Sequence, residues 1–133
     1  MFMKRSLIIT RSAIDEAVLR RHRAVASTSG AVVEFLGIVR GLEDGTPIRA
    51  IEYECFEAMA EHQFQRLFDE VERRWPVESV RVAHRVGIVA VQEPSLWVEV
   101  IAPHRGEAFA ACQWLIDEMK RTVPIWKRPV AAP

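Results

Sequence analysis

The spacing of hydrophobic residues along the chain changes several times, and each spacing predicts one kind of element. Short apolar or alternating stretches, typical of β-strands, occupy residues 7–10, 31–39, 49–55, 80–84, 88–91 and 95–102. Segments 31–39 and 49–55 flank the turn sequence Asp44-Gly45, so we expect them to pair as a hairpin. The nearly continuous apolar run at 95–102 predicts a central strand that is covered on both faces.

Two longer segments, 57–75 and 105–121, repeat their hydrophobic residues at three- and four-residue steps, which predicts amphipathic helices. Pro76 ends the first helix. Pro124 ends the second near Arg121, because proline has a fixed φ and disfavours helical backbone in the residue before it. The sequence therefore predicts where each long helix ends.

A shorter helix is predicted over residues 14–21, where Ser12 and Asp15 resemble a capping arrangement, and a short strand is expected after Pro124. The complete order, β-α-β-β-α-β-β-β-α-β, predicts an α+β fold in which helices pack on a mainly antiparallel sheet. No repeat, low-complexity stretch or linker divides the sequence. Residues 1–133 are therefore expected to form a single domain.

Composition and charge restrict the function classes. The chain has 133 residues, of which 50% are hydrophobic and 27% are charged, as in ordinary globular proteins. Lys and Arg number 18, Asp and Glu number 18, and the formal net charge is +0. No overall field therefore draws the protein to nucleic acid or to an anionic membrane. Any site for an anion must be built from a local group of cations.

The two cysteines, Cys55 and Cys112, lie far apart and form no CxxC or metal-binding spacing. Both are interpreted as buried free thiols, and neither a metal nor a cofactor is expected. The apolar run at residues 7–9 is too short for a signal peptide or a membrane span. The cytoplasm is therefore the expected compartment.

The segment 119–127 contains the strongest candidate chemistry. Lys120 lies at the end of a predicted helix, and Lys127 follows a short, stiff, apolar turn around Pro124. Two ammonium groups on a rigid element predict a site for an anionic substrate, and a lysine near other cations becomes a better nucleophile or acid/base. The alternative is that Lys120 and Arg121 only complement the helix C-terminus.

Further cations lie at the ends of predicted strands. Arg40 follows the strand 31–39, and His104-Arg105 opens a helix, where free backbone N–H groups favour a phosphate or carboxylate. A surface arginine is the alternative at Arg40, and a solvated arginine is the alternative at the helix start. His84-Arg85 is interpreted as a packed histidine followed by a surface arginine.

Arg105 and Lys120 lie fifteen residues apart on one predicted helix, which corresponds to about 22 Å. They are not expected to contact the same small ligand within one chain. Our hypothesis is a composite pocket across a homodimer, with His104 and Arg105 donated by the neighbouring protomer.

Several groups of residues, in unbroken order from about residue 30 onward, match the motifs of one known family. They are FLGIVR (35–40), IEYECF (51–56) with MA (59–60), HRVG (84–87), HR (104–105) with AF (108–109), DEMK (117–120) and VPIWK (123–127). Together they resemble the large, catalytic subunit of molybdopterin synthase.

The resemblance implies a partner, a small ubiquitin-like subunit that ends in Gly-Gly and carries a C-terminal thiocarboxylate. In this family, two sulfurs pass from such partners to cyclic pyranopterin monophosphate and form the dithiolene of molybdopterin. The implied assembly is a heterotetramer, in which a homodimer of large subunits has a small subunit at each end. The implied fold is α/β hammerhead-like. Neither nucleic acid nor a membrane is an expected partner.

The resemblance also implies roles for the candidate residues. Lys120 is expected to act as general acid/base or as transient acyl acceptor, and Lys127 to stabilise negative charge on the thiocarboxylate or an intermediate. Arg40, His104 and Arg105 are expected to hold the phosphate and the pterin. The complete set of expected substrate-binding residues is Ile38, Val39, Arg40, His104, Arg105, Lys120, Lys127 and Arg128.

The chain departs from the family pattern near its C-terminal motif. Lys127-Arg128-Pro129 stands where members often have Lys-Lys-Glu, so an acidic residue is missing, and many members continue beyond the position of Pro133. Gln92 stands where a glycine is common before the glutamate. A non-catalytic partner-binding module of the same fold is the alternative function.

Overall fold

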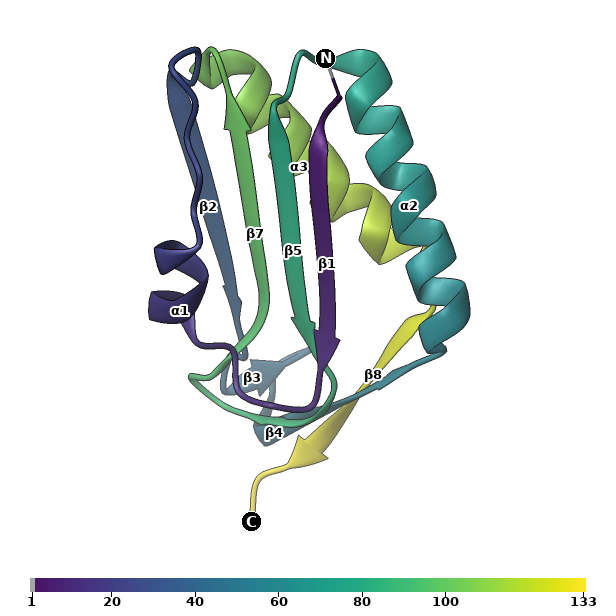
Figure 1. The fold of residues 1–133 in the computed structure, drawn as a ribbon. Helices are drawn as coiled ribbons and strands as arrows, with labels where there is room; N and C mark the ends of the chain where they lie inside the picture. Colours follow the sequence, from purple (N-terminus) through teal and green to yellow (C-terminus); the bar gives the residue numbers. More distant parts are fainter. Residues whose placement is uncertain (1) are drawn as a thin grey trace.

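Two β-sheets and three helices form the structure, a computed structural model that describes residues 2–133 (Figure 1). Met1, which the expected domain includes, lies outside the described residues. The elements are β1 (Lys4–Thr10), α1 (Glu16–Arg21), β2 (Ala31–Ile38), β3 (Leu42–Glu43), β4 (Thr46–Cys55), α2 (Glu57–Arg74), β5 (Ser79–Arg85), β6 (Gly87–Ala90), β7 (Pro94–Ala102), α3 (Arg105–Thr122) and β8 (Ile125–Ala131). This order is the predicted one with the two-residue strand β3 added, and the α+β class is confirmed.

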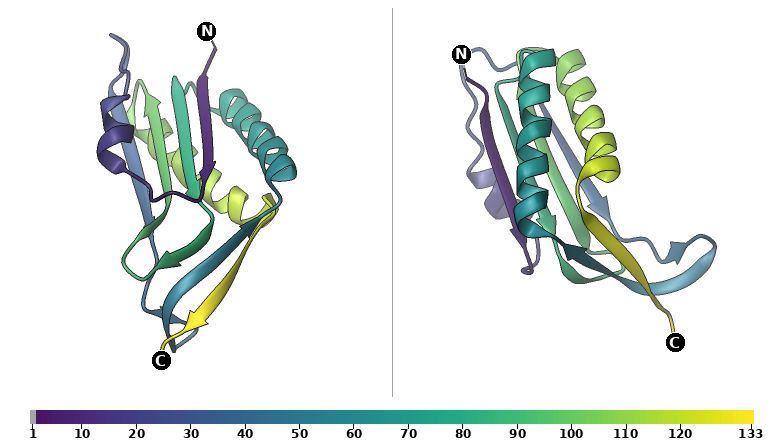
Figure 2. Two further views of the ribbon diagram at one scale, coloured as in Figure 1. Left: turned by 60° about the horizontal axis from the view of Figure 1, so that its bottom comes forward. Right: turned by 90° about the vertical axis from the view of Figure 1, so that its right-hand side faces the viewer.

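The first sheet has the strand order β1-β5-β7-β2. Strands β1 and β5 are parallel, and the other neighbours are antiparallel. Helices α2 and α3 lie side by side on one face of this sheet (Figure 2), and their apolar side chains form the main core with those of the strands. Because β7 is interior, its residues from Ser95 to Ala102 are all buried, as the continuous apolar run predicted.

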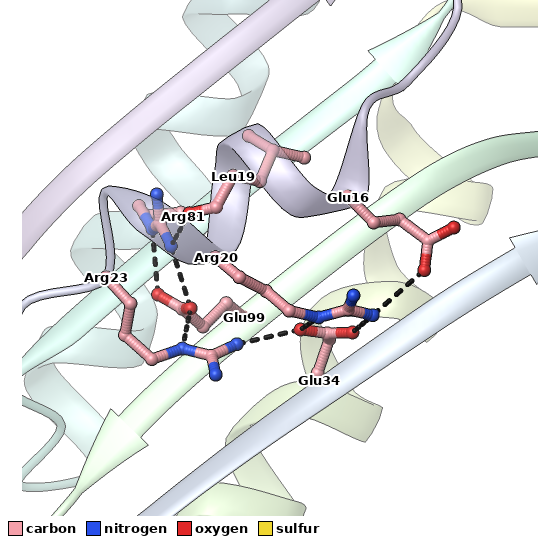
Figure 3. A network of polar contacts seen from close by, with 7 residues as sticks. All are labelled: Glu16, Leu19, Arg20, Arg23, Glu34, Arg81 and Glu99. Atoms are coloured by element: carbon pink, nitrogen blue, oxygen red, sulfur yellow. Dashed lines mark hydrogen bonds and ion pairs between the residues drawn. The ribbon is translucent and has the colours of Figure 1, made fainter.

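The opposite face of the first sheet carries a row of charges under α1 (Figure 3). Glu34, Glu99 and Arg81 stand opposite one another on β2, β7 and β5. Arg81 donates to both carboxylate oxygens of Glu99 at 2.7 and 2.8 Å, and Arg23 donates to Glu99 Oε2 at 2.6 Å. Burial alone would raise the pKa of Glu99, but these two guanidinium groups outweigh it and lower the pKa.

Helix α1 begins later than predicted. Asp15 is its N-cap, with a side-chain oxygen that accepts from the Val18 N–H at 3.2 Å. The Ser12 N–H instead donates to the Thr10 hydroxyl at 3.0 Å. The expected helix start at residue 14 is therefore wrong by two residues, because Asp15 caps the helix without Ser12.

Strand β4 lies in a second sheet, where it pairs with β3, β6 and β8. The predicted hairpin between 31–39 and 49–55 is therefore wrong, since β2 pairs with β7 instead. Asp44 and Gly45 do close a hairpin, but its strands are β3 and β4. Their φ angles of 50° and 78° match the left-handed backbone of a two-residue type I′ turn.

The end of α3 directs the chain into this second sheet. Helical backbone ends at Thr122, and Val123 is extended with φ −84° and ψ 129°, close to the stop predicted from Pro124. Strand β8 then runs antiparallel to β4, and Lys127 stands opposite Tyr53 in the register. Lys127 therefore lies near the end of α3, which carries Lys120.

Within residues 2–133, no helix combines the length and the apolar character needed to cross a lipid bilayer. The cytoplasmic location stays a prediction.

Candidate functional site

A cavity of about 420 Å³ lies where the two sheets meet the C-terminal end of α3. Its lining comes from both sheets, from the connection after β2 and from α3. The lining residues are Phe35, Gly37, Ile38, Val39, Arg40, Glu43, Ile51, Tyr53, His84, Ser95, Leu96, Met119, Lys120, Ile125 and Lys127.

Three cations line this cavity from three separate elements. Arg40 follows β2, Lys120 is in the last turn of α3, and Lys127 is on β8. All three are exposed residues, so their charged groups remain in contact with solvent at the cavity mouth. A neutral chain thus concentrates positive charge at one hollow, as the site of an anionic substrate requires.

The backbone next to Arg40 is fixed by the turn that enters β7. The Val39 N–H donates to the Glu93 carbonyl at 3.0 Å, and the Gln92 N–H donates to the Val39 carbonyl at 2.8 Å. Gln92 adopts a φ of 76° there, a left-handed conformation that glycine adopts at lower cost. The turn holds Ile38, Val39 and Arg40 against the cavity.

Glu43 is the carboxylate residue of the lining, and it faces Lys127. Its Oε1 lies 3.1 Å from the Lys127 Nζ, and 21% of its side chain is exposed. The Asp44-Gly45 turn places it there, because that turn folds the two-residue strand β3 back on β4. The predicted turn at Asp44-Gly45 thus places a charged group at the cavity.

The inner part of the cavity is lined by uncharged polar groups from three strands. His84 and Ser95 are buried, with 5% and 7% exposure, and Tyr53 is half-buried. The Tyr53 hydroxyl lies 3.3 Å from Ser95 Oγ, and the Tyr53 ring meets the imidazole edge-on with centroids 5.3 Å apart. Burial lowers the pKa of His84 despite the hydrogen bond that its ring makes to the Arg85 carbonyl.

His84 is a packed histidine, as interpreted from the sequence. Arg85 was interpreted as a surface arginine, but its side chain is mostly buried. The Arg85 side chain is 15% exposed, and its Nη1 lies 3.5 Å from Glu93 Oε1. The alternating pattern of β5 predicted that His84 points inward. It gave no sign that the inward position borders a cavity.

The other predicted residues lie away from the cavity. His104 and Arg105 are exposed at the opposite end of α3 from Lys120. The His104 N–H donates to Glu107 Oε1 at 2.9 Å, which completes a capping box at the helix start.

Arg128 is directed to the other side of the β4–β8 ladder from Lys127, because side chains alternate along a strand. It forms an ion pair with Glu52, its partner in the register, and lines a smaller hollow that Lys127 also borders. Of the eight predicted residues, the structure brings together Ile38, Val39, Arg40, Lys120 and Lys127.

The cysteines lie outside the cavity lining. Cys112 is buried, which raises the pKa of its thiol to about 11, and Cys55 is only half-buried. Burial and the charge of Glu57 raise the pKa of Cys55 as well. Both thiols are therefore protonated at neutral pH and are poor nucleophiles. Within the described part of the chain, no cluster of three His, Cys, Asp or Glu side chains is placed to hold a metal ion.

Comparison with known proteins identifies the family of this chain. The sequence profile of the MoaE protein family matches residues 9–122. The chain belongs to the MoaE family. The resemblance predicted from its motifs is thereby confirmed, and family membership gives the chain a catalytic-subunit role in molybdenum cofactor biosynthesis.

Two relatives named molybdopterin synthase catalytic subunit illustrate the similarity. The one from Thermoplasma volcanium is 41% identical over 102 residues, which cover 77% of this chain and 74% of the relative. The one from Nostoc sp. is 42% identical over 103 residues, which cover 77% of this chain and 62% of the relative. The chain thus spans about two thirds to three quarters of these MoaE relatives.

Solved structures of MoaE-family proteins share the fold. Molybdopterin synthase from Staphylococcus aureus superposes with a TM-score of 0.85 and 30% identity, covering 94% of this chain and 90% of that one. A complex of subunits 1 and 2 of the molybdopterin-converting factor from Helicobacter pylori superposes with a TM-score of 0.77 and 26% identity, covering 95% and 89%.

Proposed function

We propose that this MoaE-family chain is a sulfurtransferase. It moves sulfur from the C-terminal thiocarboxylate of a small ubiquitin-like subunit to cyclic pyranopterin monophosphate, and the product is the dithiolene of molybdopterin. The observation that carries the proposal is the convergence of Arg40, Lys120 and Lys127 on one cavity. We further infer that residues 1–133 act as one catalytic domain in the cytoplasm.

The charges of the two reactants explain why cations are needed. The substrate phosphate and the thiocarboxylate are both negative, and two like charges 4 Å apart repel by about 4 kcal/mol at an effective dielectric constant of 20. The rate would fall by about a thousandfold if this repulsion were not offset. Arg40, Lys120 and Lys127 supply three positive charges at the cavity, against the single carboxylate of Glu43.

The reaction divides into two steps for each sulfur. The thiocarboxylate sulfur forms a bond to a side-chain carbon of the pyranopterin, and a carbon–oxygen bond at that carbon breaks. The oxygen leaves as water with a proton from Lys120, or as the freed end of the cyclic phosphate. The acyl–sulfur bond then breaks on attack by water, or by the Lys120 amine to give an amide that water later hydrolyses, and either route leaves a thiolate on the pterin. Lys127 stabilises the negative charge during both steps. No thiol of the chain takes part.

The proposed assembly is a homodimer of this chain with a small subunit at each end. A two-subunit assembly is supported by the Helicobacter pylori neighbour, whose structure is a complex of two subunits. His104 and Arg105 lie at the far end of α3 from Lys120, about 22 Å along the helix axis. In our proposal these two residues complete the cavity of the neighbouring protomer and bind the phosphate, whereas Arg128 is directed away from the cavity and has no role in the proposed reaction.

The experiment is reconstitution with a thiocarboxylated small subunit and cyclic pyranopterin monophosphate. Lys120→Ala is expected to lower product formation at least 100-fold, which is the lower part of the range for a lost general acid or base. Complex formation with the small subunit is expected to stay intact. Arg121→Ala is the matched control, because Arg121 is an exposed cation of the same turn that lies outside the cavity lining.

Near-normal turnover by Lys120→Ala would remove this lysine from the mechanism. The same assay of the unsubstituted chain separates a sulfurtransferase from the alternative function. Pro129 favours that alternative, because it stands where family members often have an acidic residue. A chain that binds the small subunit but forms no product under these conditions would be a non-catalytic partner-binding module.

A further inference from the structure

The cavity has two chemically different parts. Its cations, Arg40, Lys120 and Lys127, are exposed residues near the mouth. Its inner wall carries the buried His84 and Ser95, together with the half-buried Tyr53. The proposed reaction uses only the charged part, so the uncharged inner wall has no assigned role.

The hydrogen bond of His84 determines which ring nitrogen carries the proton. His84 Nδ1 lies 2.7 Å from the Arg85 carbonyl oxygen. A carbonyl oxygen only accepts, so Nδ1 carries the hydrogen and donates it. In the neutral imidazole Nε2 then has a free lone pair and is an acceptor.

The imidazole borders the cavity with its Nδ1 edge already engaged. Among residues 2–133, no group hydrogen-bonds to Nε2. The Tyr53 ring packs against the imidazole at an interplanar angle of 75°, and the Tyr53 hydroxyl is held by Ser95. These contacts fix the ring orientation and leave the Nε2 edge for a ligand.

Burial keeps His84 neutral. The charged groups that line the same cavity are Arg40 from the β2–β3 connection, Glu43 from β3, Lys120 from α3 and Lys127 from β8. Burial lowers the pKa of His84 from its ordinary value, the hydrogen bond to the Arg85 carbonyl opposes this shift, and three of the four charged groups are cations that do not favour protonation of the imidazole. His84 is therefore an acceptor at neutral pH.

We propose that His84 is a substrate-binding residue whose Nε2 accepts a hydrogen bond from an N–H or O–H group of the heterocyclic part of the substrate. This inference rests on the proposed function. Arginine and lysine side chains are donors only, so the three cations cannot satisfy a buried donor of the ligand. A neutral acceptor can do so without adding a negative charge that would repel an anion. The site thus selects an anion attached to a hydrogen-bond-donating ring.

Two substitutions separate the nitrogens of the imidazole. His84→Asn keeps a donor near the position of Nδ1 and removes the acceptor at the position of Nε2. His84→Gln extends an amide oxygen toward the position of Nε2. Both variants are polar and uncharged, and thermal unfolding shows whether the main core of each is folded.

The KM for cyclic pyranopterin monophosphate is measured in the reconstituted reaction, and its Kd by titration calorimetry without the small subunit. His84→Asn is expected to raise both about 10-fold or more, the effect of leaving a buried ligand donor unpaired, with kcat changed only a few-fold. His84→Gln is expected to recover most of the affinity.

The pH dependence gives a readout that a structural role would not change. Protonation of Nε2 converts the acceptor to a donor, so KM of the unsubstituted protein is expected to rise as the pH falls through the lowered pKa of His84. His84→Gln lacks this rise. If the unsubstituted protein is active and both variants have its KM, Kd and pH profile, the role of His84 is overturned and the proposed function stands. Absence of turnover by the unsubstituted protein would overturn the proposed function, and absence of substrate binding would overturn both.

Discussion

Of the two lysines in the cavity, Lys127 has a carboxylate beside its ammonium group. Lys127 Nζ lies 3.1 Å from Glu43 Oε1, and 55% of the Lys127 side chain is exposed. A solvent-exposed pair of this kind contributes only about 0–1 kcal/mol to stability. We therefore expect Glu43 to affect substrate binding more than stability. Its carboxylate lies beside the Lys127 ammonium group and repels an incoming anion.

Glu43→Gln is expected to lower the KM for the anionic substrate about 2- to 10-fold, because it removes the one negative charge of the cavity lining. The free energy of unfolding is expected to change by less than about 0.5 kcal/mol. The measurements are steady-state kinetics at several salt concentrations and denaturant unfolding.

Asp44→Asn is the control for Glu43→Gln. It removes the same charge from the neighbouring turn residue, which does not line the cavity, and asparagine tolerates the φ of 50° at that position. Equal effects of the two substitutions would show that only the overall charge of the turn matters. A higher KM in Glu43→Gln would contradict the argument from local charge.

At the scale of single residues, the sequence indicated the cations of the cavity and missed its uncharged polar residues. Lys120 and Lys127 were found because Pro124 fixes the backbone between them. His84 was interpreted only as a packed residue, because burial and proximity to a cavity give the same hydrophobic pattern along one strand. Glu43 could not be found, since its partner Lys127 is distant in the sequence.

At the scale of elements, the face of the first sheet under α1 depends on Glu99. The side chain of Glu99 is 1% exposed, and Arg23 and Arg81 both donate to it. The guanidinium groups of Arg23 and Arg81 keep 26% and 17% exposure of their side chains, so they are partly hydrated. This arrangement ties the segment after α1 to the central strand β7.

Glu99→Gln is expected to destabilise the protein by about 3 kcal/mol, the lower part of the range for breaking a buried pair, because the two arginines keep some solvent. Urea unfolding at neutral pH measures this. Glu16→Gln is the control, because Glu16 is a partly exposed carboxylate at the start of α1 that also pairs with an arginine, and it is expected to change stability by less than about 0.5 kcal/mol.

The lowered pKa of Glu99 also sets the sign of the pH effect. Its contribution to stability is complete above the ordinary pKa of 4.5 and is lost as the pH falls through the lower folded-state value. The difference in stability between the unsubstituted protein and Glu99→Gln is therefore expected to shrink on acidification. A difference that stays constant down to acid pH would contradict the role of the ionised carboxylate.

Element type was predictable from the sequence, and strand pairing was not. Periodicity identified the two long helices and six of the strands, since each pattern is contained in one segment. The alternation in 31–39 and 49–55 gave no information on which strands they join. Chain proximity favoured a hairpin, whereas the structure separates these segments into two sheets.

At the scale of the whole molecule, the two ends of α3 are too far apart to contact one small ligand within a single chain. Lys120 lies at the cavity, and Arg105 lies at the other end of the helix. The helix length was predictable from the sequence, because rise per residue is constant. The full set of residues that share one cavity was only partly predictable, because it depends on how two sheets and α3 meet.

Mixing two inactive variants tests the composite site that we propose. Lys120→Ala and Arg105→Ala are each expected to be strongly impaired. When the two are unfolded together and refolded as mixed dimers, about a quarter of the unsubstituted activity is expected, since half of the dimers are mixed and each has one intact site. Activity no higher than in the separate variants would place both residues in the same chain's site, or Arg105 outside the site.

Strand β8 pairs with β4 across about seventy residues of sequence, so the second sheet forms late in any folding order that favours local contacts. Its own apolar cluster of Val39, Ile48, Ile51 and Val89 is small beside the main core under α2 and α3. The melting temperature therefore reports chiefly on the larger cluster. A preparation can retain its helical circular dichroism and its thermal midpoint while the binding hollow is unformed, and protein quality is better judged by ligand affinity.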